Sequence, residues 1–298
     1  AFISIEPPAE TLISPGVLAR ENDQSFITSQ PITVGAAIIG PTVKGPVQQP
    51  TVVTSYGDYV NTFGDVLTSG SDTYSYFTSI AAYNYFNNGG SSLLVARVVT
   101  GSYTSATSTT ISASTQASSQ PAFVLKTISK GIIMNNSGAL DSAGALISGS
   151  TDNIRWEIVN PVTSSGTFDL LIRQGNDTTT NPNVLESFTN VSLDPNQPNY
   201  IEAVVGNINQ TVAYDSSTGQ YYLQTSGSYA NASRYVRIKE VLTPTYNYFD
   251  NNGAAKSQYF GSIPLASSGS FGGATGNDIA SVTNLYQNIS TTTQGLTA

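Results

Sequence analysis

The chain has 298 residues, with 11 Lys and Arg against 19 Asp and Glu, and contains neither cysteine nor histidine. These absences exclude disulfides, thiolate chemistry, the imidazole base and the commonest zinc ligands, and the net charge of −8 argues against a surface that binds nucleic acid. Charged residues make up 10% of the chain, against about a quarter in ordinary soluble domains, so we expect either a Ser/Thr-rich exposed protein or a subunit covered by its neighbours.

The start of the chain predicts neither a signal peptide nor a membrane span. No run of residues approaches the roughly 18 apolar residues of a transmembrane helix, and no basic region precedes an apolar one. Ala1 fits removal of an initiator Met, so we expect synthesis in the cytoplasm, although a processed precursor would begin in the same way.

Residues 1–30 are predicted to form an extended arm. They hold three prolines and short apolar pairs with no periodicity that would close a core. This segment has a turn around Gly16 with apolar residues on both sides, and such residues need a surface to pack on. We therefore predict a contact between subunits made by Leu12, Ile13, Pro15, Val17 and Leu18.

Residues 31–100 are predicted to form a small α/β unit. Short β-branched or apolar runs predict strands at 32–39 and 51–54, and the run at 93–99 suits a strand covered on both faces. A helix over 56–63 follows from four apolar residues on one helical stripe, with Ser55 as N-cap and Gly64 as the terminating residue.

A second helix is predicted over residues 71–87. Its apolar face would be Phe77, Ile80, Ala81 and Tyr85, and two glycines after Asn88 would end it.

The rest of the chain is predicted to be rich in strands. Residues 101–122, nearly all Ser, Thr, Ala and Gln, are expected to be a linker or loop. A β-rich domain is predicted over 123–266, and a Gly/Ser-rich loop with the start of a further region over 267–298. Within the β-rich domain, alternating apolar residues predict a hairpin at 154–159 and 168–173 and further strands at 185–193, 221–223 and 235–238, with helix or strand at 200–205.

The predicted fold class is therefore α+β, with a small mixed α/β unit, a β-rich domain and an extended N-terminal arm.

No motif predicts a cofactor or a metal site. The glycine-rich stretch at 269–276 lacks a following Lys-Ser/Thr, so a flexible loop is favoured over a phosphate cradle. Residues 250–253 (DNNG) favour a turn over a calcium loop. Carboxylates within predicted folded segments could support hydrolysis, but none has a distinguishing context, so we predict a protein that is not an enzyme. The candidates were Asp58, Asp65, Glu157, Asp169, Glu186 and Glu202.

Blocks of sequence in a fixed order carry a family resemblance. They are ISPGV at 13–17, VGAAIIGP at 34–41, VNTFG at 60–64, YFNNGG at 85–90, VARVV at 95–99, and the stretch 184–201. Over residues 12–205 their order and spacing resemble the N-terminal part of the sheath proteins of contractile phage tails and related injection machines.

The resemblance implies a structural subunit that polymerises in stacked rings around an inner tube and contracts, without nucleotide, to drive injection. The implied partners are other copies of the chain, the inner tail tube protein, and baseplate and tail-terminator proteins, with no direct contact to nucleic acid or membrane. The implied location is the tail of the virion. The family's large C-terminal region would begin near residues 267–276, so we expect the chain to be part of a longer protein.

Two rival functions remain from the residues themselves. One is a Ser/Thr-rich surface adhesin or receptor-binding module, which would bind glycan as a monomer or trimer. The other is a hydrolase that uses a carboxylate pair such as Glu157 and Glu186.

Overall fold

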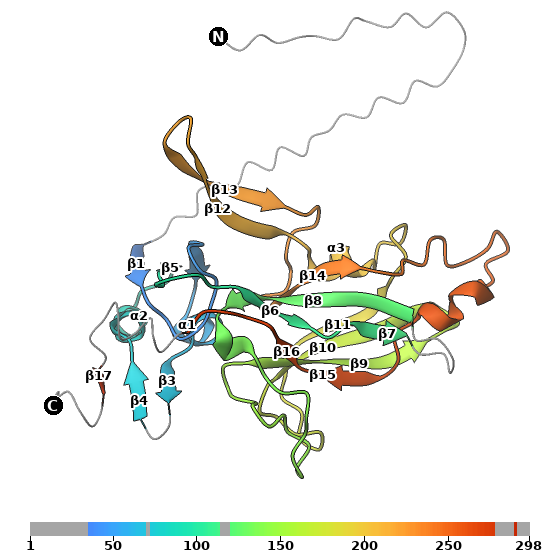
Figure 1. The fold of residues 1–298 in the computed structure, drawn as a ribbon, viewed down its shortest axis with the longest axis horizontal. Coiled ribbons are helices and arrows are strands. Elements are labelled where there is room, and N and C mark those ends of the chain that lie inside the picture. Colours follow the sequence, from blue (N-terminus) through green and yellow to red (C-terminus); the bar gives the residue numbers. More distant parts are fainter. Residues whose placement is uncertain (1–34, 70–71, 114–119, 278–288, 291–298) are drawn as a thin grey trace, which may run out of the picture. The chain divides into compact units, whose positions relative to one another are not determined.

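A computed structural model describes residues 35–69, 72–113, 120–277 and 289–290 (Figure 1). These residues belong to one compact unit. The unit contains a small sheet with two helices and a larger part made of strands. The predicted fold class, a small α/β unit plus a β-rich domain, is confirmed. The predicted arm at 1–30 lies outside the described residues, and the predicted domain boundaries stay predictions.

The small sheet has the strand order β1-β5-β2. Strand β1 (Ala36–Gly40) runs parallel to β5 (Leu93–Arg97), and β2 (Thr51–Val53) runs antiparallel to β5. A parallel neighbour requires a crossover, and the two helices between β2 and β5 supply it. The strands predicted at 51–54 and 93–99 are confirmed as elements.

Helix α1 (Tyr56–Phe63) forms where its apolar stripe predicted it. The hydroxyl oxygen of Ser55 accepts a 3.0 Å hydrogen bond from the backbone N–H of Asp58, which satisfies one of the free donors at the helix start. The helix ends at Gly64, whose φ of 77° lies in the left-handed region that glycine tolerates best.

Helix α2 (Phe77–Asn87) is shorter than predicted, because residues before it form a hairpin of β3 (Val66–Ser69) and β4 (Asp72–Ser75). Strand β17 (Ile289–Ser290) pairs with β4.

The predicted buried face of α2 was wrong except at Tyr85, which packs partly buried against the core. Its buried residues are Thr78, Ser79 and Ala82, while Phe77 is 52% exposed. Small side chains let the helix approach the sheet closely: a Cβ on Gly40 would lie 2.7 Å from the Thr78 hydroxyl oxygen. The close packing of α2 on β1 therefore sets which face of the helix is buried, and this face differs from the one that the apolar periodicity predicts.

The larger part contains two antiparallel sheets, whose core includes a stacked pair of rings, Phe123 and Phe168, with centroids 5.8 Å apart. One sheet has the order β11-β10-β9-β15 and the other the order β14-β8-β6-β16, with β7 also paired to β8. The strands are β6 (Ser105–Ser108), β7 (Ile111–Ala113), β8 (Gln120–Lys130), β9 (Ile154–Val162), β10 (Thr167–Gln174), β11 (Val184–Ser192), β14 (Val236–Val241), β15 (Ser267–Gly269) and β16 (Phe271–Gly272).

The predicted β9–β10 hairpin and the strands at 185–193 and 235–238 are confirmed. A separate hairpin joins β12 (Asn209–Asp215) to β13 (Gln220–Ser226), and of these two strands only the second was predicted. The short helices are α3 (Ile201–Val205), η1 (Ile132–Met134) and η2 (Ser257–Ser262).

Two segments predicted as loops contribute strands. In the stretch 101–122, β6 and β7 pair with β8 and bury Ala106, Ile111 and Ala113 completely. In the Gly/Ser-rich stretch, β15 and β16 each complete the edge of a sheet. Gly269 lies against the Trp156 ring, where an added Cβ would come within 2.4 Å, and Phe271 is fully buried. Small residues were selected here for close packing rather than for flexibility.

Candidate assembly surface

The residues predicted to contact a neighbouring subunit, Leu12, Ile13, Pro15, Val17 and Leu18, lie outside the described residues. The described part of the chain offers other candidate surfaces, on the small sheet and on the β12–β13 hairpin.

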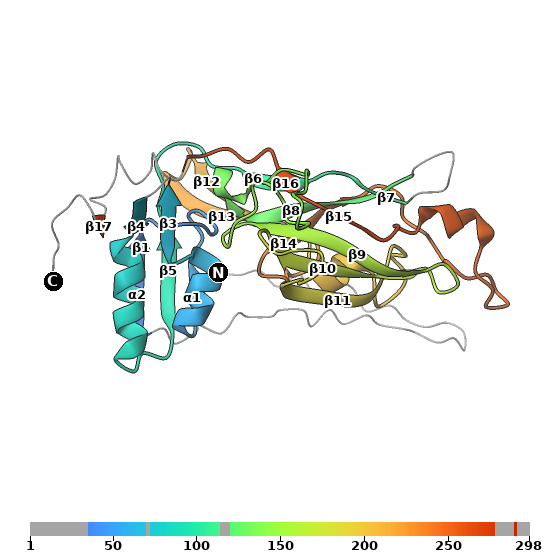
Figure 2. The same ribbon diagram turned by 90° about the horizontal axis from the view of Figure 1, so that it is seen from below.

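The small sheet is covered by helices on one face. Residues of α1 and α2 form a common core with Ile38, Leu93 and Val95, which share one side of the sheet by their register. Both helices run alongside β5 (Figure 2). The opposite face carries residues of the alternate parity: Ala37, Ile39, Val52, Leu94 and Ala96. None of these five is buried, and Ile39 is 75% exposed. We call these five residues the open face.

The open face shows that one prediction about β5 was wrong. The apolar run at 93–99 was expected to form a strand covered on both faces, but in β5 only Leu93, Val95 and Arg97 are buried. An apolar strand in the centre of a sheet with one bare side is typical of a surface that a partner covers.

The edges of the small sheet are also unpaired among the described strands. Strands β1 and β2 are its two edges, so each presents backbone N–H and C=O groups on its outer side. An added strand can pair with such an edge, which is the geometry of β-augmentation.

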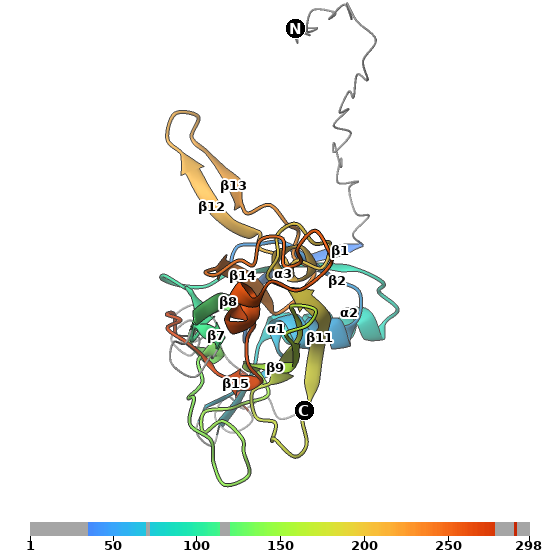
Figure 3. The ribbon, with the colours of Figure 1, turned by 90° about the vertical axis from the view of Figure 1, so that its right-hand side faces the viewer.

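The β12–β13 hairpin has one apolar face. Its register pairs Val212 with Leu223 and Tyr214 with Tyr221, and these four side chains share a side. All four are exposed, Tyr221 to 75%, and every residue of β13 is exposed. Figure 3 shows the hairpin projecting from the rest of the described strands. Because a two-stranded hairpin is marginally stable without packing, this face is a second candidate contact surface.

Three arginines are buried in the described residues, and the sequence analysis did not single them out. They are Arg97, Arg155 and Arg173, each 1% exposed or less. All three lie in strands beside apolar residues, Arg97 and Arg155 with one on each side and Arg173 after Ile172. That position could have indicated buried arginines, since a cation in an apolar strand must either face solvent or have a buried partner.

Asp177 is the partner of two of these arginines. It accepts from Arg173 Nε at 2.6 Å and from Arg155 Nη1 at 3.4 Å, and its carboxylate also accepts from the backbone N–H of Asn183 at 2.8 Å. A second carboxylate, Glu157, accepts from Arg173 Nη1 at 2.9 Å. These bonds fasten the loop after β10 to its sheet, which is a structural role.

The carboxylate pair of the hydrolase hypothesis is not brought together. Glu186 and Trp156 both pair with Ile172, so they share one face of the sheet, whereas Glu157 pairs with Leu171 on the other face. Two carboxylates on opposite faces of one sheet cannot flank a single bond. Glu186 is instead held by the Ser233 hydroxyl at 2.6 Å and the Arg234 backbone N–H at 2.9 Å.

The turn predicted at 250–253 is confirmed. The Asp250 carboxylate accepts from the backbone N–H groups of Asn252 and Ala254 at 2.8 and 2.9 Å. Within the part of the chain that the structure describes, no three acidic side chains gather where they could hold a metal ion. None of the helices described there is long and apolar enough to cross a membrane.

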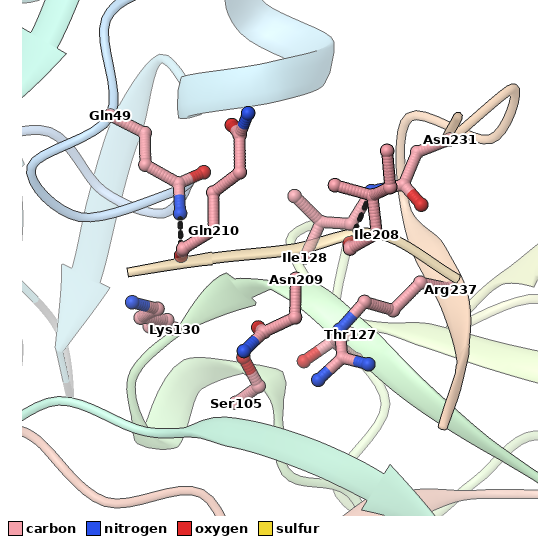
Figure 4. Close-up of a pocket in the computed structure, with 10 residues that line it drawn as sticks. All are labelled: Gln49, Ser105, Thr127, Ile128, Lys130, Ile208, Asn209, Gln210, Asn231 and Arg237. Carbon is pink, nitrogen blue, oxygen red and sulfur yellow. Dashed lines mark hydrogen bonds between the residues drawn. The ribbon is translucent and has the colours of Figure 1, made fainter. Parts of the chain in front are cut away.

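The cavities in the described residues differ in size. One beside Gln120, Thr243 and residues 257–262 has about 600 Å³ and is a wide surface depression. Another, of about 250 Å³, is lined by Lys44 and Asp152, whose ion pair spans 3.6 Å. Burial lowers the pKa of Lys44 and raises that of Asp152, because it penalises both charges more than the pair recovers. A third cavity, next to Gln49, Lys130 and Arg237, has only about 30 Å³ (Figure 4). That volume suits a water or two and excludes an organic ligand.

The chain is similar to known proteins in structure but not in sequence. No family model matches the sequence, and no curated protein is significantly similar to it. In structure the chain is similar to the sheath tail protein of Listeria innocua, with 12% identity and a TM-score of 0.36, over 81% of this chain and 34% of that one. It is also similar to a sheath tail protein of Desulfitobacterium hafniense, with 12% identity and a TM-score of 0.28, over 82% of this chain and 41% of that one.

Both structures bear the name of the family that the sequence blocks resemble. The chain spans about a third to two fifths of the length of these proteins.

Proposed function

We propose that this chain is a structural subunit of a contractile tail sheath, located in the tail of a virion. In this proposal, copies polymerise in stacked rings around an inner tube and contract to drive injection. The inner tail tube protein, the baseplate and the tail terminator would be its further partners.

The observation that carries the proposal is the open face of the small sheet. Five apolar residues on three strands line this face; none of them is buried, Ala37 and Ile39 are exposed, and Ile39 is 75% exposed. A monomer that works by catalysis gains nothing from such a face, whereas a polymerising subunit buries it against a neighbour. The low charge of the chain supports the same reading, because charged residues are depleted in the cores of interfaces.

The sequence blocks give independent support. The blocks at 34–41, 60–64, 85–90 and 95–99 resemble the sheath signature, and their described residues lie in or next to β1, α1, α2 and β5. These four blocks therefore fall in one connected part of the structure, the small α/β unit.

We propose that Leu12, Ile13, Pro15, Val17 and Leu18 form the contact of the arm with a neighbouring copy. Apolar residues of an extended segment bind most readily at a sheet edge, where the backbone pairs and alternate side chains enter apolar pockets.

The test is electron microscopy of the purified full chain, beside a variant with Leu12, Ile13, Val17 and Leu18 replaced by serine. The variant keeps the length and the net charge of the arm. We expect ordered tubes or rings from the unaltered chain and single particles from the variant. Single particles from the unaltered chain at every concentration would refute the proposal, and tubes from both would refute the role of the arm residues.

A second function is favoured by one observation, the aromatic face of the β12–β13 hairpin. Exposed tyrosines can stack on sugar rings, so a glycan-binding adhesin remains the alternative. It predicts a monomer or trimer in the same micrographs, and loss of glycan binding on replacing Tyr214 and Tyr221 by serine.

A further inference from the structure

A cluster of cations occupies the outer face of the sheet β14-β8-β6-β16. Lys126 of β8 and Arg237 of β14 are directly opposite each other in the strand register. Lys130, four residues along β8, lies on the same face as Lys126. The opposite face of β8 carries Phe123 and Leu125 and forms the core. We call Lys126, Lys130 and Arg237 the basic face.

The basic face is not neutralised within the described residues. Two neighbouring cations do have acidic partners there, since Arg234 pairs with Asp58 and Lys239 pairs with Glu240. The structure gives no ion pair to the three members of the basic face. The nearest hydrogen bond is a long one, 3.5 Å from Arg237 Nη1 to the carbonyl oxygen of Ile238.

The pKa values of the two lysines also indicate that their charges are not neutralised. Burial and the charge of Arg237 both lower the pKa of Lys126. Burial lowers the pKa of Lys130 too, and Lys126 and Arg237 add to the effect. Like charges directly opposite in a sheet are destabilising, so folding alone does not account for this arrangement.

Binding of a small molecule does not account for the three clustered cations either. The cavity beside Lys130 and Arg237 has about 30 Å³ and is lined largely by polar side chains such as Ser105, Asn209 and Gln49 (Figure 4). All three cations are partly buried, and residues 208–210 share the cavity with Lys130 and Arg237. A partner therefore meets the exposed part of these side chains at the surface of the molecule, and it must bring carboxylates.

We propose that the basic face docks on an acidic surface of a second copy of this chain. The chain has 19 acidic against 11 basic residues, so the rest of each copy supplies the negative charge that the basic face lacks. Charge complementarity of this kind selects the partner and fixes the register of the contact.

The contact must be head-to-tail. In a two-fold symmetric dimer the same patch meets itself, and two basic faces would repel each other. A basic face that meets an acidic surface elsewhere on the next copy leaves one free surface at each end, so the contact propagates into a ring or a filament. This inference rests on the proposed function in that both require self-association, and it names the surface that drives it.

The test compares two double variants with the same change in net charge. The first is Lys126→Gln with Arg237→Gln, which removes the opposed pair. The control is Arg234→Gln with Lys256→Gln, which lie outside the basic face. Sedimentation velocity gives the concentration at which each chain begins to associate. We expect that concentration to rise at least tenfold for the first variant and to stay unchanged for the control.

Three further readouts separate a contact from a structural role. Association of the unaltered chain should weaken in about 1 M salt, where charges are screened beyond about 3 Å. The melting temperature of the first variant should be equal or higher, because an opposed like-charge pair is gone. The first variant retains its acidic surface, so a tenth part of it mixed into the unaltered chain should cap growing polymers and shorten them.

Unchanged association of the first variant would overturn the proposal, and so would a lowered melting temperature that accompanies lost association. If tubes form from the first variant as readily as from the unaltered chain, the contact fails while the sheath function stands. If the unaltered chain forms short salt-sensitive oligomers but no tubes, the sheath function fails while the contact stands.

Discussion

Arg97 donates a hydrogen bond of 2.8 Å from Nη1 to the backbone carbonyl oxygen of Lys130. The same nitrogen donates to the carbonyl oxygen of Gly45 at 2.9 Å. Arg97 is the last residue of β5 in the small sheet, and Lys130 is the last residue of β8 in the β-rich part. A fully buried guanidinium therefore joins the two parts of the molecule by satisfying carbonyl groups from both.

Replacing Arg97 by methionine should lower the free energy of unfolding by about 2–4 kcal/mol, because the carbonyl oxygen of Lys130 loses its donor and that of Gly45 keeps only the 3.2 Å bond from the Lys130 backbone N–H. Urea denaturation measures this loss. Arg234→Met is the control, since the Arg234 side chain is 61% exposed and its pair with Asp58 is a surface contact. The control should lose less than about 1 kcal/mol. Equal losses in the two variants would contradict the role assigned to Arg97.

Replacing Asp177 by asparagine should lower the free energy of unfolding by about 3–5 kcal/mol, because two buried arginines would share the single remaining carboxylate of Glu157. Asp250→Asn is the control, as asparagine also suits the exposed turn there. We expect that variant to remain within about 0.5 kcal/mol of the unaltered chain. Calorimetric melting curves that coincide for the two variants would argue against a buried charge network.

Alanine should cost more stability at Gly64 than at Gly253. Both glycines have a positive φ, 77° and 79°, so alanine incurs a backbone cost of at least roughly 1–2 kcal/mol at each, and the ψ of 163° at Gly64 adds to that cost. At Gly64 the added Cβ would lie 2.7 Å from the Cβ of buried Val43, whereas nothing lies within 4 Å at Gly253. Gly64→Ala should therefore cost about 1–3 kcal/mol more in denaturant unfolding. Equal losses of stability in the two variants would mean that the Val43 side chain moves aside without cost.

Glu186 should make the free energy of unfolding depend on pH. Burial raises its pKa, although hydrogen bonds from Ser233 and Arg234 oppose the shift. The folded state thus binds this proton more tightly than the unfolded state, and the stability due to Glu186 falls as pH rises from its ordinary pKa of 4.5 through the raised value. Glu186→Gln should remove this slope. The stability difference between the two chains, measured across that range, should favour the unaltered chain more at lower pH. A difference that is constant with pH would contradict the assignment.

How much could be read from the sequence differs between elements. Helix α1 was predicted with its cap and its end, since Ser55, the apolar stripe and Gly64 all act within ten residues. The hairpin of β9 and β10 and strands β5, β11 and β14 were predicted for the same reason, because their signals are local alternation or an apolar run. The resemblance to sheath proteins also came from sequence blocks alone.

Other features were invisible because they depend on residues far apart in the chain. Strands β6 and β15 consist of small and mostly polar residues whose local preference is for a loop, and β7 and β16 are only three and two residues long. They form by pairing with strands distant in the chain, β6 and β7 with β8, β15 with β9 and β16 with β6. The orientation of α2 was decided by the close approach of Thr78 to Gly40.

The sequence by itself determined the class of the fold, the chemistry that is missing and the direction of the charge balance, since each of these is a sum over residues or a local pattern. Tertiary structure alone decided that one face of the small sheet is open, that three arginines are buried, and that Lys126 faces Arg237. The physical reason is that burial and electrostatic pairing depend on distance in space, and strand register sets that distance only once the sheets have formed.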